Sequence, residues 1–285
     1  MYVLCCPCIK NPALRAHGIT KPADLVLFGR CIERCTQFGI EMVSLPCPET
    51  MYLGAGREPG TFLERLNTPE FARLVDTLEV QVNEIIKERG APLCILGVNS
   101  SPTCGVTSTH YGSEGNEPPK QEGRGVFLAR FSHIRAIDVA AFAQYRVYLA
   151  APLFSEAERE YNRAISGLLK ENFYDVFLPQ ENGDISAARD GQAHLRIFEQ
   201  NKKALNNADL VVAIIDGADA DSGTAWEMGY ASALGKPVIA LRTDFRQVGQ
   251  EELVNLMLEQ SAVVVRDKEE LLKVLAGRVI GKPGA

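Results

Sequence analysis

Short apolar runs alternate with polar loops and amphipathic segments along the second half of the chain. The runs Val147–Phe154, Ala208–Ile215 and Val238–Leu241 have strand length and are rich in β-branched or small apolar residues. Between the last two lies an acidic, glycine-containing loop, 216–223, which leads into an Ala- and Gly-rich helical segment that ends near Leu234. The order strand, loop, helix, strand predicts a parallel sheet, in which ligands bind where strands end and helices begin.

The first half of the chain shows the same alternation. Its apolar runs Tyr2–Leu4, Ile40–Leu45 and Leu93–Val98 predict three strands. Helical spacing of apolar residues over 22–38 and 68–89 predicts the helices between these strands. This half is therefore also expected to have an α/β fold.

We expect two α/β domains, residues 1–140 and 141–285, each a mainly parallel sheet flanked by helices. A length of 285 residues fits two domains of ordinary size. The second domain should be flavodoxin- or Rossmann-like, because its strands alternate with helical segments.

The composition describes an ordinary globular protein. Apolar residues make up 46% of the chain and charged residues 23%, and the net charge of −6 disfavours a general nucleic-acid binder but not a nucleoside ligand. No apolar run reaches transmembrane length, and the amino terminus lacks the basic region and long apolar core of a signal peptide. We therefore expect a cytoplasmic protein that acts on a small molecule, without membrane contact.

The cysteines are confined to the first half. All eight precede residue 105, and Cys8, Cys47 and Cys104 lie in the turns after the three predicted strands, so these thiols should converge at one sheet edge. In a cytosolic protein they favour metal binding or catalysis over disulfides. Their intervals of about forty and sixty residues are unlike the close pairs of structural zinc sites, and three thiolates suit an iron–sulfur cluster with one open iron. The residue types alone leave a cluster, zinc and buried thiols as alternatives.

Three short segments, 3–8, 46–49 and 101–105, resemble the signature segments of the 4-thiouracil desulfidase family in content and order. The resemblance implies that the three converging cysteines hold a 4Fe-4S cluster whose open iron accepts the sulfur of a thiolated pyrimidine. It also implies catalytic roles for Glu49 and Ser101, which match the acid/base and substrate-positioning residues of that family.

Three carboxylates lie in or just after the acidic loop: Asp216, Asp221 and Glu227. A carboxylate at such a place acts as a nucleophile, a general base or a capping group. Glu227 lies six residues after Asp221, on the first turns of the predicted helix. The loop lacks the Lys–Ser/Thr pair of a phosphate-binding loop.

The run Val147–Phe154 and the acidic loop together resemble the nucleoside 2-deoxyribosyltransferase family, over about residues 145–285. The resemblance implies that Glu227 attacks the anomeric carbon of a 2′-deoxynucleoside, which is covalent catalysis by a carboxylate. It implies that Asp221 is the acid/base that protonates the leaving base, and that Tyr148 orients the glutamate.

The same resemblance implies a substrate-binding set. Its members are Asp216, Gly223, Asn201, Asn255 and Met257. Asn255 matches a residue that a neighbouring subunit contributes to the sugar site, so the resemblance also implies a homo-oligomer.

Several positions depart from the two family patterns. Cys5 and Cys6 stand where the desulfidases have small residues, and Thr103 stands where they have a serine. Asn201 stands where the deoxyribosyltransferases usually carry an aspartate, so this position keeps a hydrogen-bonding side chain without its charge.

The two resemblances together imply an enzyme that processes nucleosides, thionucleosides or nucleobases. The first domain would desulfurise a thiolated pyrimidine, and the second would cleave or transfer an N-glycosidic bond through a glutamyl-deoxyribose intermediate. One alternative is a deoxynucleoside 5′-monophosphate N-glycosidase with a vestigial cysteine domain, in which Ser155 or Ser222 meets the phosphate. Another is a nucleotide-binding sensor without catalytic activity.

Overall fold

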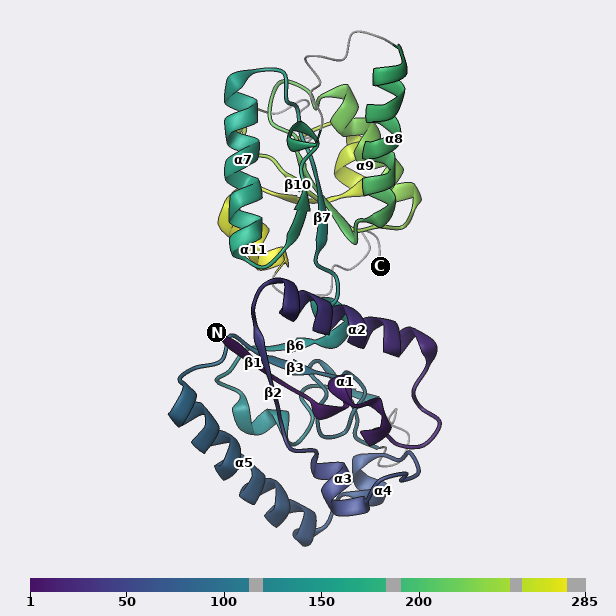
Figure 1. Cartoon of the computed structure of the whole chain (residues 1–285), viewed down its shortest axis with the longest axis vertical. Helices are drawn as coiled ribbons and strands as arrows, with labels where there is room; N and C mark the ends of the chain where they lie inside the picture. Colours follow the sequence, from purple (N-terminus) through teal and green to yellow (C-terminus); the bar gives the residue numbers. More distant parts are fainter. Residues whose placement is uncertain (113–119, 183–190, 247–252, 276–285) are drawn as a thin grey trace. The chain divides into compact units, whose positions relative to one another are not determined.

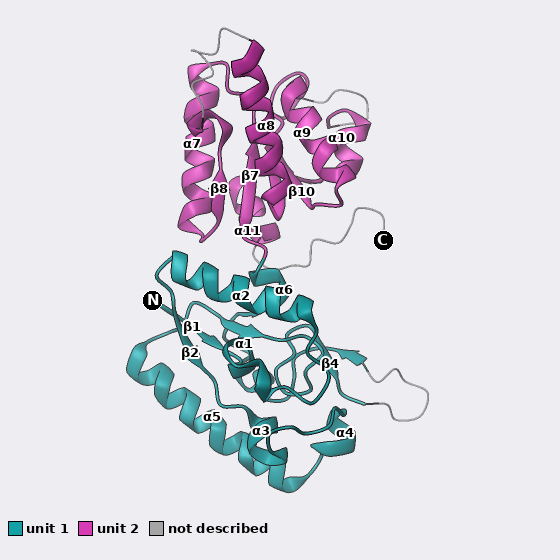
Figure 2. Ribbon diagram, turned by 45° about the vertical axis from the view of Figure 1, so that its right-hand side comes forward, with its two compact units in different colours: residues 1–143 teal, residues 144–285 magenta. Residues whose placement is uncertain are grey.

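The computed structural model describes residues 1–112, 120–182, 191–246 and 253–275 (Figure 1). The chain forms two compact units, Met1–Ala143 and Gln144–Ala285 (Figure 2). The domain boundary predicted from the sequence lies between residues 140 and 141. In the described part of the chain, no helix combines the length and apolar character needed to cross a membrane.

The first unit is built on a four-stranded parallel sheet with the strand order β2-β1-β3-β6. Its strands are β1 (Tyr2–Cys5), β2 (Glu41–Ser44), β3 (Ile95–Gly97) and β6 (Ala136–Asp138), and β4 (Ser108–His110) pairs antiparallel with β5 (Lys120–Glu122). Its helices are α1 (Pro7–Lys10), α2 (Pro22–Gln37), α3 (Pro48–Leu53), α4 (Phe62–Arg65), α5 (Pro69–Arg89) and α6 (Val139–Phe142), with 3-10 turns η1 (Pro12–Leu14) and η2 (Leu128–Phe131). The helices α2 and α5 lie on opposite faces of the sheet (Figure 1).

Helix α5 shows how local sequence sets these elements. Thr68 caps its amino terminus by accepting a hydrogen bond from the Phe71 backbone, and Pro69 occupies the first turn, where no amide hydrogen is required. Phe71, Val75, Leu78 and Val82 recur at spacings of three and four, and all four are buried, so one face of the helix packs on the sheet. The helix ends at Gly90, which has a left-handed φ of 81°.

The second unit is a five-stranded parallel sheet with the strand order β11-β10-β9-β7-β8. Its strands are β7 (Arg146–Ala150), β8 (Asp175–Phe177), β9 (Leu210–Ile214), β10 (Val238–Leu241) and β11 (Val263–Val265). Its helices are α7 (Glu156–Glu171), α8 (Gly191–Asn207), α9 (Ser222–Ala233), α10 (Leu256–Ser261) and α11 (Lys268–Leu275), with a 3-10 turn η3 (Pro179–Glu181). The helices α7 and α11 lie on one face of the sheet, and α8 and α9 lie on the other (Figure 1).

The strand order fixes where ligands bind in the second unit. Counted within this unit, the order is 2-1-3-4-5, the flavodoxin-like arrangement, and it reverses between β7 and β9. In sheets of this order, the loops after the two strands at the reversal leave on opposite faces, and ligands commonly bind between them at the carboxyl edge. The first unit repeats this pattern, with its reversal between β1 and β3. The predicted α/β fold class with mainly parallel sheets is confirmed.

The central strands are buried on both faces. Every residue of β9 is buried, as are the last four residues of β7. Strands covered by helices on both sides are apolar throughout rather than alternating, which is why their sequences are continuous apolar runs.

Candidate functional site

Tyr148 and Glu227 meet on the α9 side of the second sheet, although 79 residues separate them in the chain. Tyr148 comes from the buried middle of β7, and its hydroxyl donates a hydrogen bond to Glu227 Oε1. The ring of Phe177, in β8, stacks on the Tyr148 ring with their centroids 5.4 Å apart. The phenol is therefore held by packing, and it holds the carboxylate in turn.

The surroundings of Glu227 change its acidity. Burial raises its pKa to about 7; the hydrogen bond from Tyr148 opposes this rise, and the charge of Asp221 adds to it. Burial and the neighbouring carboxylate raise the pKa of Tyr148, so this hydroxyl stays protonated as a donor. Glu227 therefore titrates near neutral pH, as is common for carboxylates that react.

Asp221 is the amino-terminal cap of α9. Its Oδ2 accepts hydrogen bonds from the Thr224 backbone at 3.0 Å and from the Thr224 hydroxyl at 3.3 Å. Gly223 leaves room for this cap, because a Cβ at that position would lie 3.1 Å from Asp221 Oδ2. The cap fixes Asp221 within electrostatic reach of Glu227.

Asp216 ties two loops together. Its Oδ1 accepts from the Thr243 backbone and from the Asp244 backbone at 2.8 Å, and its Oδ2 accepts from the Thr243 hydroxyl at 2.8 Å. The buried Arg242 strengthens the same junction by donating to the Ile215 carbonyl at 2.6 Å. The structure thus gives Asp216 a loop-joining role, while its predicted contact with substrate stays a prediction.

The remaining predicted substrate-binding residues are Asn201, Asn255 and Met257. Asn255 is exposed and caps α10 by accepting from the Met257 backbone at 3.0 Å, and the Met257 side chain is 76% exposed. Asn201 is half-buried on α8. Within the described residues, no hydrogen bond joins these three side chains to the Tyr148–Glu227 pair.

The first unit brings the three predicted cysteines together. Cys8 lies in α1 after β1, Cys47 caps α3 after β2, and Cys104 follows β3. Burial raises the pKa of the Cys8 thiol, and the neighbouring Cys104 and Cys47 raise it further, so the three sulfurs lie within electrostatic reach of one another. The thiol of Cys6, which is fully buried, is hydrogen-bonded with that of Cys104.

The turn that carries Cys104 is held by side-chain oxygens. Asn99 Oδ1 accepts from the backbones of Val106 and Thr107, each at 3.0 Å. Ser101 Oγ accepts from the Cys104 backbone at 3.1 Å. These bonds take the place of regular secondary structure and fix the Cys104 thiol at the strand end.

Thiolates are the ligands that iron–sulfur clusters use, so the chemistry of this donor set fits a cluster. Across residues 1–112, 120–182, 191–246 and 253–275, no three His, Cys, Asp or Glu side chains are grouped to hold one ion.

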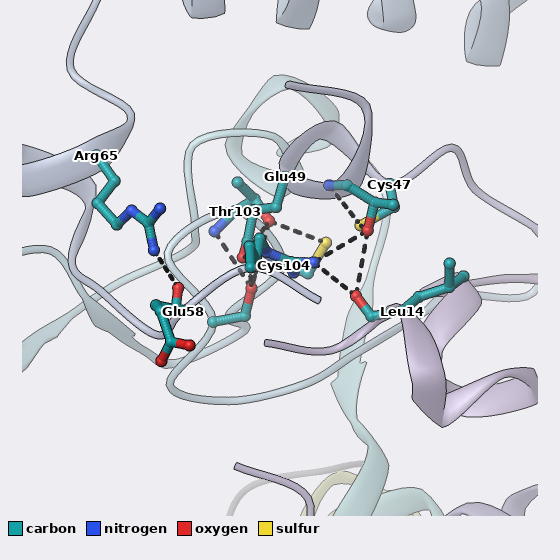
Figure 3. A network of polar contacts seen from close by, with 10 residues as sticks. Leu14, Cys47, Glu49, Glu58, Arg65, Thr103 and Cys104 are labelled. Atoms are coloured by element: carbon teal, nitrogen blue, oxygen red, sulfur yellow. Dashed lines mark hydrogen bonds and ion pairs between the residues drawn. The ribbon is translucent and has the colours of Figure 1, made fainter. Parts of the chain in front are cut away.

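Glu49 is the centre of a polar network beside Cys104 and Cys47 (Figure 3). Its Oε1 accepts from the Ser101 hydroxyl at 3.0 Å and from the Thr103 hydroxyl at 2.7 Å. Its Oε2 accepts from Arg57 Nε at 3.2 Å and Nη2 at 2.9 Å. The structure therefore brings Glu49 and Ser101 together, while their predicted catalytic roles stay predictions.

The family model described as nucleoside 2-deoxyribosyltransferase matches residues 147–268, within the second unit. An uncharacterized protein of Ureaplasma parvum is 32% identical over 129 residues, which cover 40% of this chain and 80% of that protein. Through its second unit, the chain belongs to the nucleoside 2-deoxyribosyltransferase family. This confirms the resemblance drawn from the acidic loop, whereas no comparison bears on the desulfidase resemblance of the first unit.

Other relatives of this deoxyribosyltransferase unit have more specific names. A protein of Thermofilum pendens, named provisionally as a 2′-deoxynucleoside 5′-phosphate N-hydrolase, is 31% identical over 97 residues, or 34% of this chain and 66% of that protein. A 2-deoxyribosyltransferase of Bacillus psychrosaccharolyticus with a solved structure is 28% identical, covers 44% of this chain and 89% of its own, and has a TM-score of 0.39.

Four residues around these sites were not predicted from the sequence. The spacing of Asp221 and Thr224 is a capping signal that would have revealed Thr224. Phe177, Arg57 and Arg242 gave no such signal. Aromatic residues on strands and arginines in loops are common in proteins without any part in a functional site.

Proposed function

We propose that the second unit cleaves or transfers the N-glycosidic bond of a 2′-deoxynucleoside, with Glu227 as nucleophile. The observation that carries this proposal is the half-buried Glu227 carboxylate oriented by the Tyr148 hydroxyl beside the strand-order reversal. Membership of the nucleoside 2-deoxyribosyltransferase family supports the same reaction class.

The proposed reaction has two steps. First, a Glu227 oxygen forms a bond to the anomeric carbon while the bond from that carbon to the base nitrogen breaks, and Asp221 gives a proton to the leaving base. Then water or a second base attacks the glycosyl ester at the same carbon, Asp221 takes a proton from this acceptor, and the Glu227 carboxylate is released. Tyr148 holds Glu227 in the attacking orientation throughout.

The geometry favours a nucleoside over a 5′-phosphate as substrate. A phosphate at the amino terminus of α7, near Ser155, needs free backbone amides. There the Glu158 carboxylate already accepts from the Phe154 backbone at 2.9 Å and from the Ser155 backbone at 2.7 Å. An anion at this position would meet a negative charge and satisfied donors.

The test is a product analysis by liquid chromatography. Deoxynucleosides are incubated with the full chain, with and without a second free base. A new deoxynucleoside would indicate transfer, and free base with deoxyribose would indicate hydrolysis. No release of base from any of the natural deoxynucleosides or their 5′-phosphates would contradict the proposal. A preference for the 5′-phosphates would contradict only the argument from Glu158.

We further propose that the first unit desulfurises a thiolated pyrimidine. Cys8, Cys47 and Cys104 would hold a 4Fe-4S cluster, and the bound cluster would supply a Lewis-acidic iron for the soft sulfur of the substrate. Glu49 and Ser101 would move the proton of the attacking water, because their side chains share a hydrogen bond of 3.0 Å. The convergence of the three thiols beside Glu49 supports this assignment.

Iron and sulfide analysis of the chain purified without oxygen, together with a visible absorption spectrum, tests the desulfuration proposal. Iron and acid-labile sulfide in similar amounts, with a broad thiolate-to-iron absorption band, are expected. An iron-free chain that takes up no iron on reconstitution would contradict it and would leave the glycosyl proposal untouched.

We also propose that the chain acts as a homo-oligomer. Asn255, the cap of α10, and Met257, on α10, are both exposed. A neighbouring copy would present these side chains to the sugar. Mixing inactive Glu227→Ala and Asn255→Ala chains is expected to restore part of the activity, whereas inactive mixtures or a monomeric mass in light scattering would contradict this proposal.

A further inference from the structure

Arg57 lies in the loop between α3 and α4, and its side chain is only 5% exposed. A buried guanidinium requires compensation for its lost hydration, through paired charge and hydrogen bonds. Arg57 has both. The position of these bonding partners, rather than their number, suggests what the residue does.

Arg57 bonds directly to the segments that carry Cys8 and Cys47, and it is connected to the Cys104 segment through Glu49. Its Nη1 donates to the Leu14 carbonyl at 2.8 Å, at the end of the turn that follows the Cys8 helix. The same nitrogen donates to the Thr50 hydroxyl at 3.1 Å, and that hydroxyl lies 3.1 Å from Cys47 Sγ.

The third connection runs through Glu49. Arg57 pairs with Glu49 Oε2, while Glu49 Oε1 accepts from Ser101 and Thr103, in the turn before Cys104. Figure 3 shows Glu49 beside Thr103 and Cys104. The backbone carbonyl of Arg57 also accepts from the His17 backbone at 2.7 Å. Other bonds also join these segments, such as that from the Thr50 hydroxyl to the Leu14 carbonyl at 3.1 Å, and Arg57 donates to the groups that make them.

We propose that Arg57 is the positioning residue of the cysteine site, which sets the separation of Cys8, Cys47 and Cys104 before any metal group is bound. This inference rests on the proposed ligand role of these cysteines. Bidentate pairing of a guanidinium with a carboxylate fixes both distance and orientation, which an ammonium does not. Residues that orient metal ligands typically change metal affinity by about 10–100-fold when they are replaced.

The test compares Arg57→Gln and Arg57→Lys with the wild-type chain. The matched controls are Arg73→Gln and Arg73→Lys, because Arg73 is 71% exposed and pairs with Glu70 on the same helix. Two readouts are measured without oxygen: iron bound per chain on reconstitution with limiting ferrous iron and sulfide, and the rate at which iodoacetamide alkylates each cysteine of the metal-free chain, followed by mass spectrometry. Circular dichroism melting identifies variants that fail to fold.

Arg57→Gln is expected to bind iron at least tenfold more weakly than wild type, and Arg57→Lys to recover part of this loss. In the metal-free chain, Cys8, Cys47 and Cys104 should be alkylated at least fivefold faster in Arg57→Gln, while the buried Cys31 and Cys94 keep their wild-type rates. If Arg57→Gln does not fold, Arg57→Lys is compared with Arg73→Lys. Alkylation of Cys8, Cys47 and Cys104 should then rise selectively in Arg57→Lys, by a smaller factor.

Unchanged iron uptake and alkylation in Arg57→Gln would overturn the proposal. An equal rise in alkylation at all cysteines would also overturn it, because Arg57 would then support the fold as a whole. If wild type binds no iron, the ligand role of the cysteines fails, and the selective alkylation of Cys8, Cys47 and Cys104 still decides whether Arg57 positions them.

Discussion

Glu49 follows β2, the second strand of its unit, and Glu227 follows β9, the third strand of its unit, and the neighbours of the two carboxylates differ. Glu227 accepts from a neutral phenol, and burial raises its pKa to about 7. Glu49 accepts from the Arg57 guanidinium on one oxygen and from two hydroxyls on the other. The hydrogen bond from Tyr148 therefore compensates the desolvation of Glu227 only in part, whereas both oxygens of Glu49 are paired.

The difference matches two kinds of chemistry. A nucleophilic carboxylate must keep an oxygen available to the reacting carbon, which a single hydrogen bond from Tyr148 permits. A carboxylate held on both oxygens is suited to receiving a proton through a hydroxyl that it already contacts, such as that of Ser101. We therefore expect covalent chemistry at Glu227 and proton transfer at Glu49.

Replacing Glu227 should give the largest effect, and it tests the proposed role of Glu227 as the nucleophile. Glu227→Ala removes the proposed nucleophile, so base release from deoxynucleosides should fall by about 10³-fold or more. Glu160→Ala, an exposed change on α7, serves as control and should leave the rate unchanged. Activity in Glu227→Ala within tenfold of wild type would assign the nucleophile to another residue.

Asp221→Asn should lower the rate by about 10²-fold, because a general acid contributes on that scale. Asparagine caps a helix as well as aspartate does, so α9 should stay intact and the melting temperature should hold. The loss should shrink for nucleosides whose bases leave easily, which rate measurements on a leaving-group series would show. An equal loss across that series would contradict an acid role.

The cysteine site is tested by Cys47→Ser. Losing one of three thiolates should lower bound iron at least tenfold after anaerobic reconstitution. Cys31→Ser is the control, because Cys31 is buried and donates to the Val139 carbonyl at 3.3 Å, a bond that serine can also make. Equal iron content in the two variants would remove Cys47 from the ligand set.

Tyr148→Phe should lower the rate by about tenfold and shift its pH dependence. The Tyr148 hydrogen bond lowers the pKa of Glu227, so its removal should move that pKa above 7. The reactive form is the carboxylate, and the rising limb of the pH–rate profile should therefore move to higher pH. A profile that keeps its wild-type midpoint would show that Tyr148 does not tune Glu227.

The smallest effect concerns stability. The pKa of Glu227 is about 7 in the folded chain against 4.5 ordinarily, so the folded state holds an extra proton between these values and loses stability as pH rises through this window. Glu227→Gln lacks this proton linkage and should be more stable than wild type at pH 8 by about 1–2 kcal/mol, with a smaller difference at pH 4.5. Urea unfolding at the two pH values measures it, and a difference independent of pH would contradict a buried, titrating carboxylate.

The fold was predictable from the sequence because strands buried on both faces appear as continuous apolar runs, and because capping residues mark where helices begin. Val147–Ala150 and Leu210–Ile214 are uninterrupted apolar runs, and Thr68-Pro69 and Ser155 mark helix starts. The loop-joining bonds of Asp216 were not predictable, because they depend on which loop lies beside it in space. Arg57 escaped prediction for the same reason: its partners lie seven to 43 residues away.

The covalent step at Glu227 is tested most directly by trapping it. The full chain is incubated with a 2′-fluorinated deoxynucleoside, whose electron-withdrawing fluorine disfavours the oxocarbenium-like transition state and slows breakdown of the glycosyl ester. Peptide mass spectrometry after acid quenching should find the fluorinated sugar on the peptide that contains Glu227, and Glu227→Gln should show none. Release of the base with no adduct, or an adduct on another side chain, would contradict the assignment of Glu227 as nucleophile.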